Sequence, residues 1–256
     1  KVMLQNMRER HILAQFDDPQ ITAVLGDWDM DGAVRPGDGD FLMVVDSNIG
    51  FNKTNAAVKG SLTYDVDLTD LTRPASTLVV FEENDSPATR SCIQYGGLDV
   101  GDKYPIYYCY YNYLRVYRPA GTQLTDATPH QIPADWMALK QSVPARVDTL
   151  EENIAGVQGY GTLVVVPGGQ AENTRFQFAL PSGVVQQKAG SNSYTYSLKV
   201  QKQPGTQAVP ITIRVHLPAS ARVTSLPAGA IQQGSDLLLD TNLRLDVLFS
   251  VEFDLP

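Results

Sequence analysis

The sequence predicts a mainly β protein: an antiparallel, Ig-like β-sandwich preceded by a short N-terminal helical lead-in. Two observations predict this class. From Phe41 onward, segments rich in β-branched and aromatic residues alternate between apolar and polar side chains. Gly, Pro, Asn and Asp bound these segments at short intervals, as is typical of sandwiches with Greek-key or similar connections. One large sandwich and two joined sandwiches both fit this pattern.

Four segments are expected along the chain. Residues 1–39 are predicted to be a helical lead-in and an acidic loop that end a preceding domain. Residues 40–125 and 161–256 are predicted to be the two parts of the sandwich. Residues 126–160 are rich in Pro and Ala and are predicted to connect these parts.

The lead-in is predicted to be helical. Over residues 1–25, side chains recur near one helical face at Leu4, Met7, His11 and Phe16. A second short helix is expected to have Asp18 as its N-cap, Pro19 at its first position and Gly26 as its stop. Its apolar side is formed by Ile21, Val24 and Leu25.

Nine strands are predicted after the lead-in, because each segment carries β-branched or aromatic residues and is bounded by turn formers. They cover residues 42–46, 56–68, 76–83, 105–119, 161–167, 174–181, 194–203, 209–218 and 246–255. Prolines at or near several strand ends fit strand termination, because proline cannot donate a hydrogen bond to the ladder.

The tyrosine-rich segment YYCYYNYLRVYRP, residues 107–119, has two interpretations. Successive side chains of a strand point to opposite faces, so Tyr111, Tyr113 and Tyr117 share one face with Cys109 and Arg115. In one interpretation the rings are buried in a long central strand. In the other, Tyr111, Tyr113 and Tyr117 form an exposed platform on which sugars stack. We favour the buried strand.

Cys92 and Cys109 are the two cysteines of the chain. The segment between them has turn residues at Gly96, Gly97, Gly101, Asp102 and Pro105, so the chain can fold back and pair the thiols. In an oxidising compartment this disulfide would stabilise the fold by about 3 kcal/mol. The alternative is two buried free thiols in a cytosolic protein.

An acidic loop follows the second predicted helix. Asp27, Asp29, Asp31 and Gly32 have the spacing that begins a calcium-binding loop, and Asp38 stands at the twelfth position. Alternating carboxylates followed by glycine can wrap oxygen ligands around one hard cation. Against calcium, the twelfth position lacks the longer Glu. The alternative is a solvated acidic turn between helix and sheet.

Composition excludes several functions. The 28 acidic and 20 basic residues give a formal charge of −8, which argues against nucleic acid as a partner. No stretch approaches the roughly 18 apolar residues of a membrane span. The three histidines are dispersed, and no nucleophile elbow, P-loop or dinucleotide fingerprint is present, so we expect no catalytic residues in this chain.

Several segments together resemble a known family. They are GDWDMDGAV, GDFLMVVDSNIGFNKTN, SLTYDVDL, YYCYYNYLRVYRPAGTQL and YSLKVQKQPGTQAVPITIRVHLP. These segments are similar to the C-terminal region of bacterial and archaeal proteins grouped as domain of unknown function family 4012. The resemblance implies membrane-anchored envelope proteins whose preceding part is similar to the LytR-CpsA-Psr glycopolymer transferases. It therefore implies an extracytoplasmic location, at the cell surface or secreted, and supplies no catalytic residues here.

Within this resemblance, the Asn- and Gly-rich stretch at residues 48–55 suits tight turns, because Asn side chains satisfy loop backbone groups. We favour that structural role. Lys53 is the candidate for contact with an anion.

The sequence thus predicts a non-catalytic, extracytoplasmic β-module of a cell-envelope protein, with a structural or protein-interaction role. One alternative is a binding module for a surface glycopolymer. The other is an accessory part of an envelope glycopolymer transferase whose catalytic residues precede residue 1. Calcium at the acidic loop is the one cofactor considered.

Overall fold

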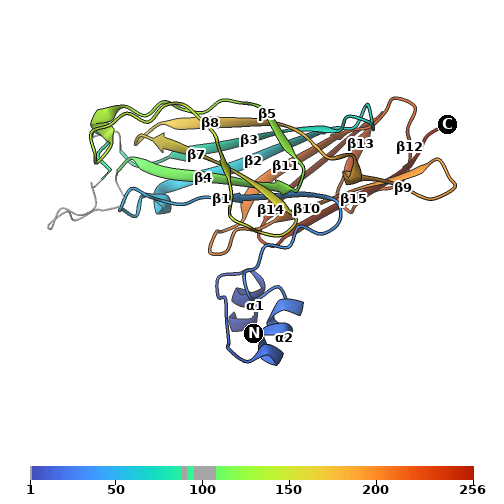
Figure 1. Cartoon of the computed structure of the whole chain (residues 1–256), viewed down its shortest axis with the longest axis horizontal. Coiled ribbons are helices and arrows are strands. Elements are labelled where there is room, and N and C mark those ends of the chain that lie inside the picture. The colour runs from blue at the N-terminus through green and yellow to red at the C-terminus, as the bar shows by residue number, and fades with distance from the viewer. Residues whose placement is uncertain (1, 88–90, 95–107) are drawn as a thin grey trace.

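The computed structural model describes residues 2–87, 91–94 and 108–256, and it shows two β-sheets packed face to face (Figure 1). Two short helices, α1 (Val2–Arg8) and α2 (Pro19–Asp27), project from one long side of this sandwich. Tyr107 and the turn residues predicted between the cysteines, Gly96, Gly97, Gly101, Asp102 and Pro105, lie outside the described residues.

The first sheet has the order β12-β15-β10-β1-β4-β7-β6, and β9 also pairs with β10. Its strands are β1 (Asp40–Val45), β4 (Tyr110–Pro119), β6 (Asp148–Leu150), β7 (Val157–Val166), β9 (Val185–Gln187), β10 (Ser193–Gln201), β12 (Arg222–Ser225) and β15 (Val247–Asp254).

The second sheet has the order β13-β14-β11-β2-β3-β8-β5. Its strands are β2 (Val58–Asp67), β3 (Ala75–Asn84), β5 (Gln123–Ala127), β8 (Ala171–Ala179), β11 (Val209–His216), β13 (Ile231–Gln233) and β14 (Asp236–Leu243). Three short 3-10 turns lie at Thr54–Ala57, Ala134–Trp136 and Ser182–Val184.

The predicted mainly β sandwich is confirmed, but both sheets are mixed, so the fold is neither purely antiparallel nor clearly Ig-like. In the first sheet β1 runs parallel to β10, with Asp40 opposite Leu198. In the second, β2 runs parallel to β11, with Leu62 opposite Ile211. The alternation of apolar and polar residues has the same period in either strand direction, so it cannot report direction. Each sheet combines strands from both halves of the chain.

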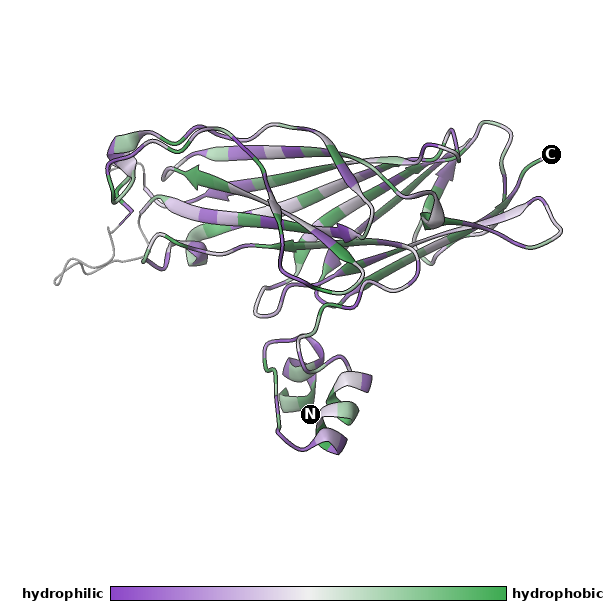
Figure 2. Cartoon of the chain, in the orientation of Figure 1, coloured by the Kyte–Doolittle hydropathy of each residue, from purple (hydrophilic) through white to green (hydrophobic). Residues whose placement is uncertain are grey.

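The apolar core lies between the sheets, where green and purple alternate along the strands of Figure 2. β3 is the simplest case: every second residue, from Ser76 to Asn84, is buried. Among the largest fully buried side chains are Tyr64, Tyr196, Phe176, Phe249 and Phe253.

A polar cluster sits inside this core. The carboxylate of Asp40 accepts hydrogen bonds from the phenols of Tyr64 (2.6 Å) and Tyr196 (2.7 Å). It also accepts one from Nη2 of Arg118, at 2.9 Å, and both charged side chains have 0% exposure. The Arg118 guanidinium lies 4.7 Å from the Tyr64 ring centroid. Because Tyr64 belongs to the second sheet and the others to the first, this cluster ties the two sheets together.

The helical lead-in differs from its prediction. α1 ends at Arg8, and residues 9–18 do not continue the helix predicted over residues 1–25. Arg10 has a left-handed φ of 55°, which is incompatible with an α-helix, and its side chain reaches the sandwich instead. The predicted N-cap Asp18 and first residue Pro19 of α2 are confirmed, but the helix passes Gly26 and ends at Asp27.

Candidate docking surface

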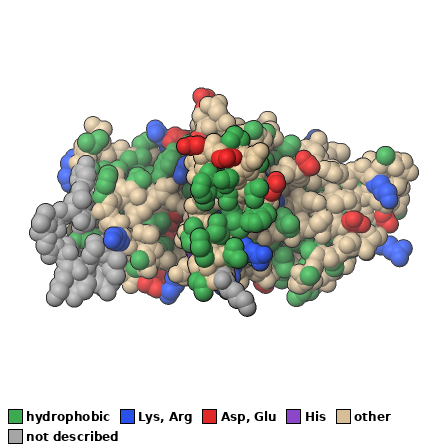
Figure 3. All heavy atoms as spheres, turned by 90° about the horizontal axis from the view of Figure 1, so that it is seen from below, with side chains coloured by type: hydrophobic (Ala, Val, Ile, Leu, Met, Phe, Trp, Pro, Cys, Tyr) green, Lys and Arg blue, Asp and Glu red, His purple; other side chains and the backbone are tan. Residues whose placement is uncertain are grey.

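The helical unit, residues 2–30, exposes most of its apolar side chains. α1 buries none of its residues, and α2 buries only Leu25. We define the apolar face as the nine large apolar side chains of this unit that are exposed: Val2, Met3, Leu4, Ile12, Leu13, Phe16, Ile21, Val24 and Trp28. Their exposure runs from 40% at Ile12 to 75% at Val2. Figure 3 shows apolar side chains gathered at the centre of the side that carries the helices.

Local sequence explains why this face stays outward. The Asp18 carboxylate accepts hydrogen bonds from the backbone N–H groups of Gln20 (2.8 Å) and Ile21 (3.4 Å), which fixes the start of α2. Leu25 then points inward, and Met30 is 5% exposed. Ile21 and Val24 are three residues apart on α2, and Trp28 is the C-cap residue that follows it, so all three are exposed along the same short helix and its end.

One buried ion pair fixes the helical unit to the sandwich. The Arg10 guanidinium donates to both carboxylate oxygens of Asp246, at 2.5 and 2.9 Å, and to the backbone carbonyl of Lys202. The Arg10 carbonyl accepts a hydrogen bond from the Gly205 backbone. A second pair, Arg244 with Glu9, lies beside it at 2.9 Å. The apolar face is therefore held in a defined position without being covered.

Acidic side chains border the apolar face. Asp17, Asp18 and Asp27 are exposed, whereas Arg8 is the one exposed Lys or Arg side chain within residues 2–30, and His11 is exposed as well. In Figure 3, acidic side chains follow one edge of the central apolar area. One edge of this surface is thus negative, while Lys and Arg side chains lie at other parts of its border (Figure 3).

The acidic loop pairs with an arginine. Nη2 of Arg35 lies 2.6 Å from Asp31, and Nη1 lies 3.4 Å from Asp29. The Arg35 hydrogen bonds hold the pKa of the Asp31 carboxyl at about 2. Asp27 and Asp38 are exposed, and among the described residues no three His, Cys, Asp or Glu side chains form a metal-binding group. Calcium at Asp27, Asp29, Asp31 and Asp38 stays a prediction.

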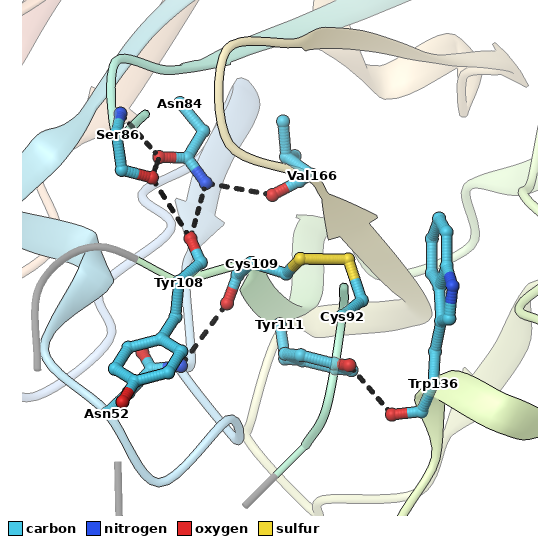
Figure 4. The surroundings of a disulfide bond; sticks show 9 residues. All are labelled: Asn52, Asn84, Ser86, Cys92, Tyr108, Cys109, Tyr111, Trp136 and Val166. Atoms are coloured by element: carbon cyan, nitrogen blue, oxygen red, sulfur yellow. Dashed lines mark hydrogen bonds between the residues drawn. A yellow bond between two sulfur atoms is a disulfide. The ribbon is translucent and has the colours of Figure 1, made fainter. Parts of the chain in front are cut away.

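The two cysteines form a disulfide, as favoured from sequence. Their sulfur atoms are bonded, and the Cα atoms lie 5.3 Å apart (Figure 4). The bond is buried with Tyr111, Ile132 and Val165 on the outer side of the first sheet. Asn52 Nδ2 donates to the Cys109 carbonyl, and the Asn84 amide donates to the Tyr108 and Val166 carbonyls.

The tyrosine strand is largely buried on both faces. Tyr111 is 0% exposed, and its hydroxyl donates to the Trp136 carbonyl at 2.7 Å (Figure 4). Tyr117 is 4% exposed, while Tyr113 is half-buried. A stacking platform needs exposed rings, so these three tyrosines do not form one. The predicted connection, residues 126–160, covers this face of the tyrosine strand, since Ile132, Trp136, Met137 and Val143 pack around Tyr111.

Tyr117 lines a surface depression of about 270 Å³ together with Glu152 and Asn153. The polar groups there already bind one another: the Tyr117 hydroxyl donates to Glu152, and Arg115 lies 3.1 Å from the same carboxylate. Burial, then the Glu152 hydrogen bond, raises the pKa of Tyr117 to about 12.

The Asn-rich stretch has the structural role favoured from sequence. The Asn48 amide donates to the Asn52 carbonyl at 3.0 Å, and its side-chain oxygen accepts from the Gly50 backbone. Asn52 in turn accepts from the Thr54 backbone. Lys53 is exposed beside these turns, and its contact with an anion stays a prediction.

Two carboxyl groups meet where the sheets face each other. The Asn112 amide donates to Glu82 at 2.7 Å and to Asp46 at 2.8 Å. Burial, then the charge of Asp46, raises the pKa of Glu82 to about 8. Burial also raises the pKa of Asp46.

Sequence reasoning missed the apolar face and the Glu82 and Asp46 pair. The sequence shows that Ile21 and Val24 share the apolar side of a helix, but not whether that side is covered. Nothing marks Glu82, which lies about 30 residues from its partner Asn112. Among the described residues, no helix is long and apolar enough to cross a membrane.

Neither a protein-family model nor a curated protein matches this chain. Among solved structures, it is similar to a putative nutrient-binding protein from Legionella pneumophila, with 9% identity, a TM-score of 0.47, and coverage of 84% of this chain and 71% of that one. It is also similar to an M1 zinc metallopeptidase from Deinococcus radiodurans, with 12% identity, a TM-score of 0.32, and coverage of 77% and 42%. Yeast LTA4 hydrolase matches with 7% identity, a TM-score of 0.37, and coverage of 78% and 30%.

This chain therefore spans less than half the length of the metallopeptidase and of the hydrolase. At these identities and TM-scores, the similarities identify neither a family nor a function.

Proposed function

We propose that this chain is a non-catalytic, extracytoplasmic interaction module of a cell-envelope protein, and that the apolar face of its helical unit docks onto another protein. The observation that carries this proposal is the exposure of nine large apolar side chains on residues 2–30. Contiguous apolar surface of this extent usually marks a binding site.

Helix length supports the proposal. α1 has 7 residues and α2 has 9, whereas isolated helices shorter than roughly 12 residues are marginal in water. Most helical stability in proteins comes from packing an apolar face. A partner that covers this face would supply the burial that the sandwich does not.

The disulfide supports the location. Structural disulfides persist in oxidising compartments and are rare in the cytosol. The bond between Cys92 and Cys109 is buried among apolar side chains, as expected for a structural bridge. The resemblance noted in the sequence implies the same compartment.

Site-specific photocrosslinking in the native host tests the docking function. A photoreactive amino acid at Phe16 or Trp28 of the full-length protein is expected to give a discrete crosslinked product at the cell envelope. The same residue at Leu248, which is 72% exposed on β15 of the sandwich, is the matched control and should give none. Equal crosslinking at the two locations, or no product at Phe16 and Trp28, would contradict the proposal.

A further inference from the structure

The size of the apolar face sets the scale of its partner. A standard protein interface buries on the order of 800 Å² on each side. Nine large apolar side chains, each between two-fifths and three-quarters exposed, offer an area of that order. The face is therefore large enough for a specific protein contact, rather than for a small ligand alone.

The shape of the face favours a helix. Ile21 and Val24 on α2, with Trp28 at its end, have the spacing at which one helix presents a ridge to another. Leu13 and Phe16, in the non-helical segment between α1 and α2, are exposed as well. Amphipathic helices commonly bind such surfaces through apolar residues spaced three and four apart.

The charge beside the apolar face favours a basic helix as the partner. The exposed carboxylates of Asp17, Asp18 and Asp27 border the face, and the whole chain carries a formal charge of −8. Complementary potentials speed association and exclude wrong partners, whereas facing like charges oppose it. Anionic membrane surfaces and acidic helices are disfavoured for the same reason.

The same charge disfavours a second copy of this chain. A symmetric dimer would bring two chains together that each carry a formal charge of −8 and the same exposed carboxylates beside the face.

We infer that the apolar face binds an amphipathic helix of another protein, whose apolar stripe is flanked by Lys and Arg. This inference rests on the proposed docking function and names its partner class. The Lys and Arg side chains lie opposite Asp17, Asp18 and Asp27, while the apolar stripe covers Phe16, Val24 and Trp28.

Two synthetic helical peptides of roughly 18 residues, or about five turns, test this chemistry. Both have the same Leu stripe; one is flanked by Lys and the other by Glu. In calorimetric titrations of the purified chain, the Lys-flanked peptide should bind at least about tenfold tighter, and the ratio should shrink in high salt, which screens exposed charges. Equal affinity, or no binding of the Lys-flanked peptide, would overturn the inference.

Substitutions test whether the Lys-flanked peptide binds at the apolar face. Phe16→Asp and Val24→Asp should each abolish binding, while Leu248→Asp and Leu139→Asp, at exposed apolar positions on the sandwich and the connection, should leave it unchanged. Asp17→Lys with Asp27→Lys should reverse the preference toward the Glu-flanked peptide. Asp18 is left intact because it caps α2. Circular dichroism and thermal melts verify that each variant is folded.

Analytical sedimentation tests whether a second copy of the chain occupies the apolar face. The chain alone should be monomeric at tens of micromolar concentration. A dimer that Phe16→Asp dissociates would show that a second copy occupies the face, and would overturn the inference. If crosslinking at Phe16 and Trp28 succeeds in cells but the Lys-flanked peptide does not bind, the docking function stands and the partner class is wrong.

Discussion

At the scale of single residues, Glu82 lies in an environment that disfavours its charged form. It is 3% exposed, and its described contacts are the Asn112 amide and the nearby carboxyl group of Asp46. Glu172 stands opposite it on β8 and adds a second negative charge. A buried carboxyl group among acids is cheaper to keep protonated than ionised.

Stability should therefore fall as the pH rises. The pKa of Glu82 is about 8 in the folded chain, against an ordinary value of 4.5, so between these values the folded state binds more protons than the unfolded state. The contribution of Glu82 is fully present below pH 4.5, is lost as the pH rises through 8, and then levels off. Glu82→Gln should reduce this slope, leaving the part that comes from Asp46, and should stabilise the chain at pH 9 by on the order of 2 to 4 kcal/mol.

Chemical denaturation at several pH values measures this effect. Glu83→Gln, one residue away and on the opposite face of β3, is the matched control and should keep the slope. An unchanged pH dependence in Glu82→Gln would show that Glu82 is ionised in the folded chain.

At the scale of elements, the helical unit depends on the ion pair between Arg10 and Asp246. The side chain of Arg10 is 6% exposed and that of Asp246 is 17% exposed, so solvent screens this pair weakly. No local pattern could predict the pair, because its partners lie 236 residues apart. The helix prediction over residues 1–25 was wrong over residues 9–18, where Arg10 has a left-handed φ and its guanidinium binds the distant carboxylate of Asp246.

Arg10→Ala should release the helical unit while leaving the sandwich folded. Loss of a buried, charged contact is worth about 3 kcal/mol, so amide exchange in residues 2–30 should accelerate about 100-fold, with little change in the strands. Hydrogen exchange followed by mass spectrometry measures both. Arg244→Ala, at a pair where the arginine is 60% exposed, is the control and should have a small effect. Uniform acceleration over the whole chain would contradict a local role.

At the scale of the whole molecule, the polar cluster around Asp40 joins the two sheets. Asp40→Asn would leave the Arg118 guanidinium buried without its counter-charge, at a cost of about 3 to 5 kcal/mol. Replacing both, Asp40→Asn with Arg118→Met, should restore much of this loss, because an apolar residue then fills the site. A double-mutant cycle from urea denaturation measures the coupling. Additive losses would show that the two charges do not depend on each other.

The fold class was predictable from sequence to the level of strands and burial. All nine predicted strands overlap observed ones, because apolar alternation reports which face of a strand is buried. The short strands β6, β9 and β13, with 3 residues each, are too brief for a period to appear. Strand neighbours were not predictable, since partners such as Asp40 and Leu198 are set by the global packing.

Of the candidate sites, the disulfide was predictable because only one pairing exists for two cysteines. The apolar face was not identified, because Ile21 and Val24 follow the pattern of a buried helix. Sequence periodicity shows which side of a helix is apolar. Only the tertiary structure shows whether another part of the chain covers that side.

The parallel pairing of β1 with β10 also sets the order of events during synthesis. The neighbour of residues 40–43 is residues 198–201, so the centre of the first sheet cannot close until four-fifths of the chain has emerged. Contacts between residues so distant in sequence slow folding. Until such strands pair, their edges are exposed and prone to aggregation. The first stable intermediate should therefore be the local antiparallel pair β2 and β3.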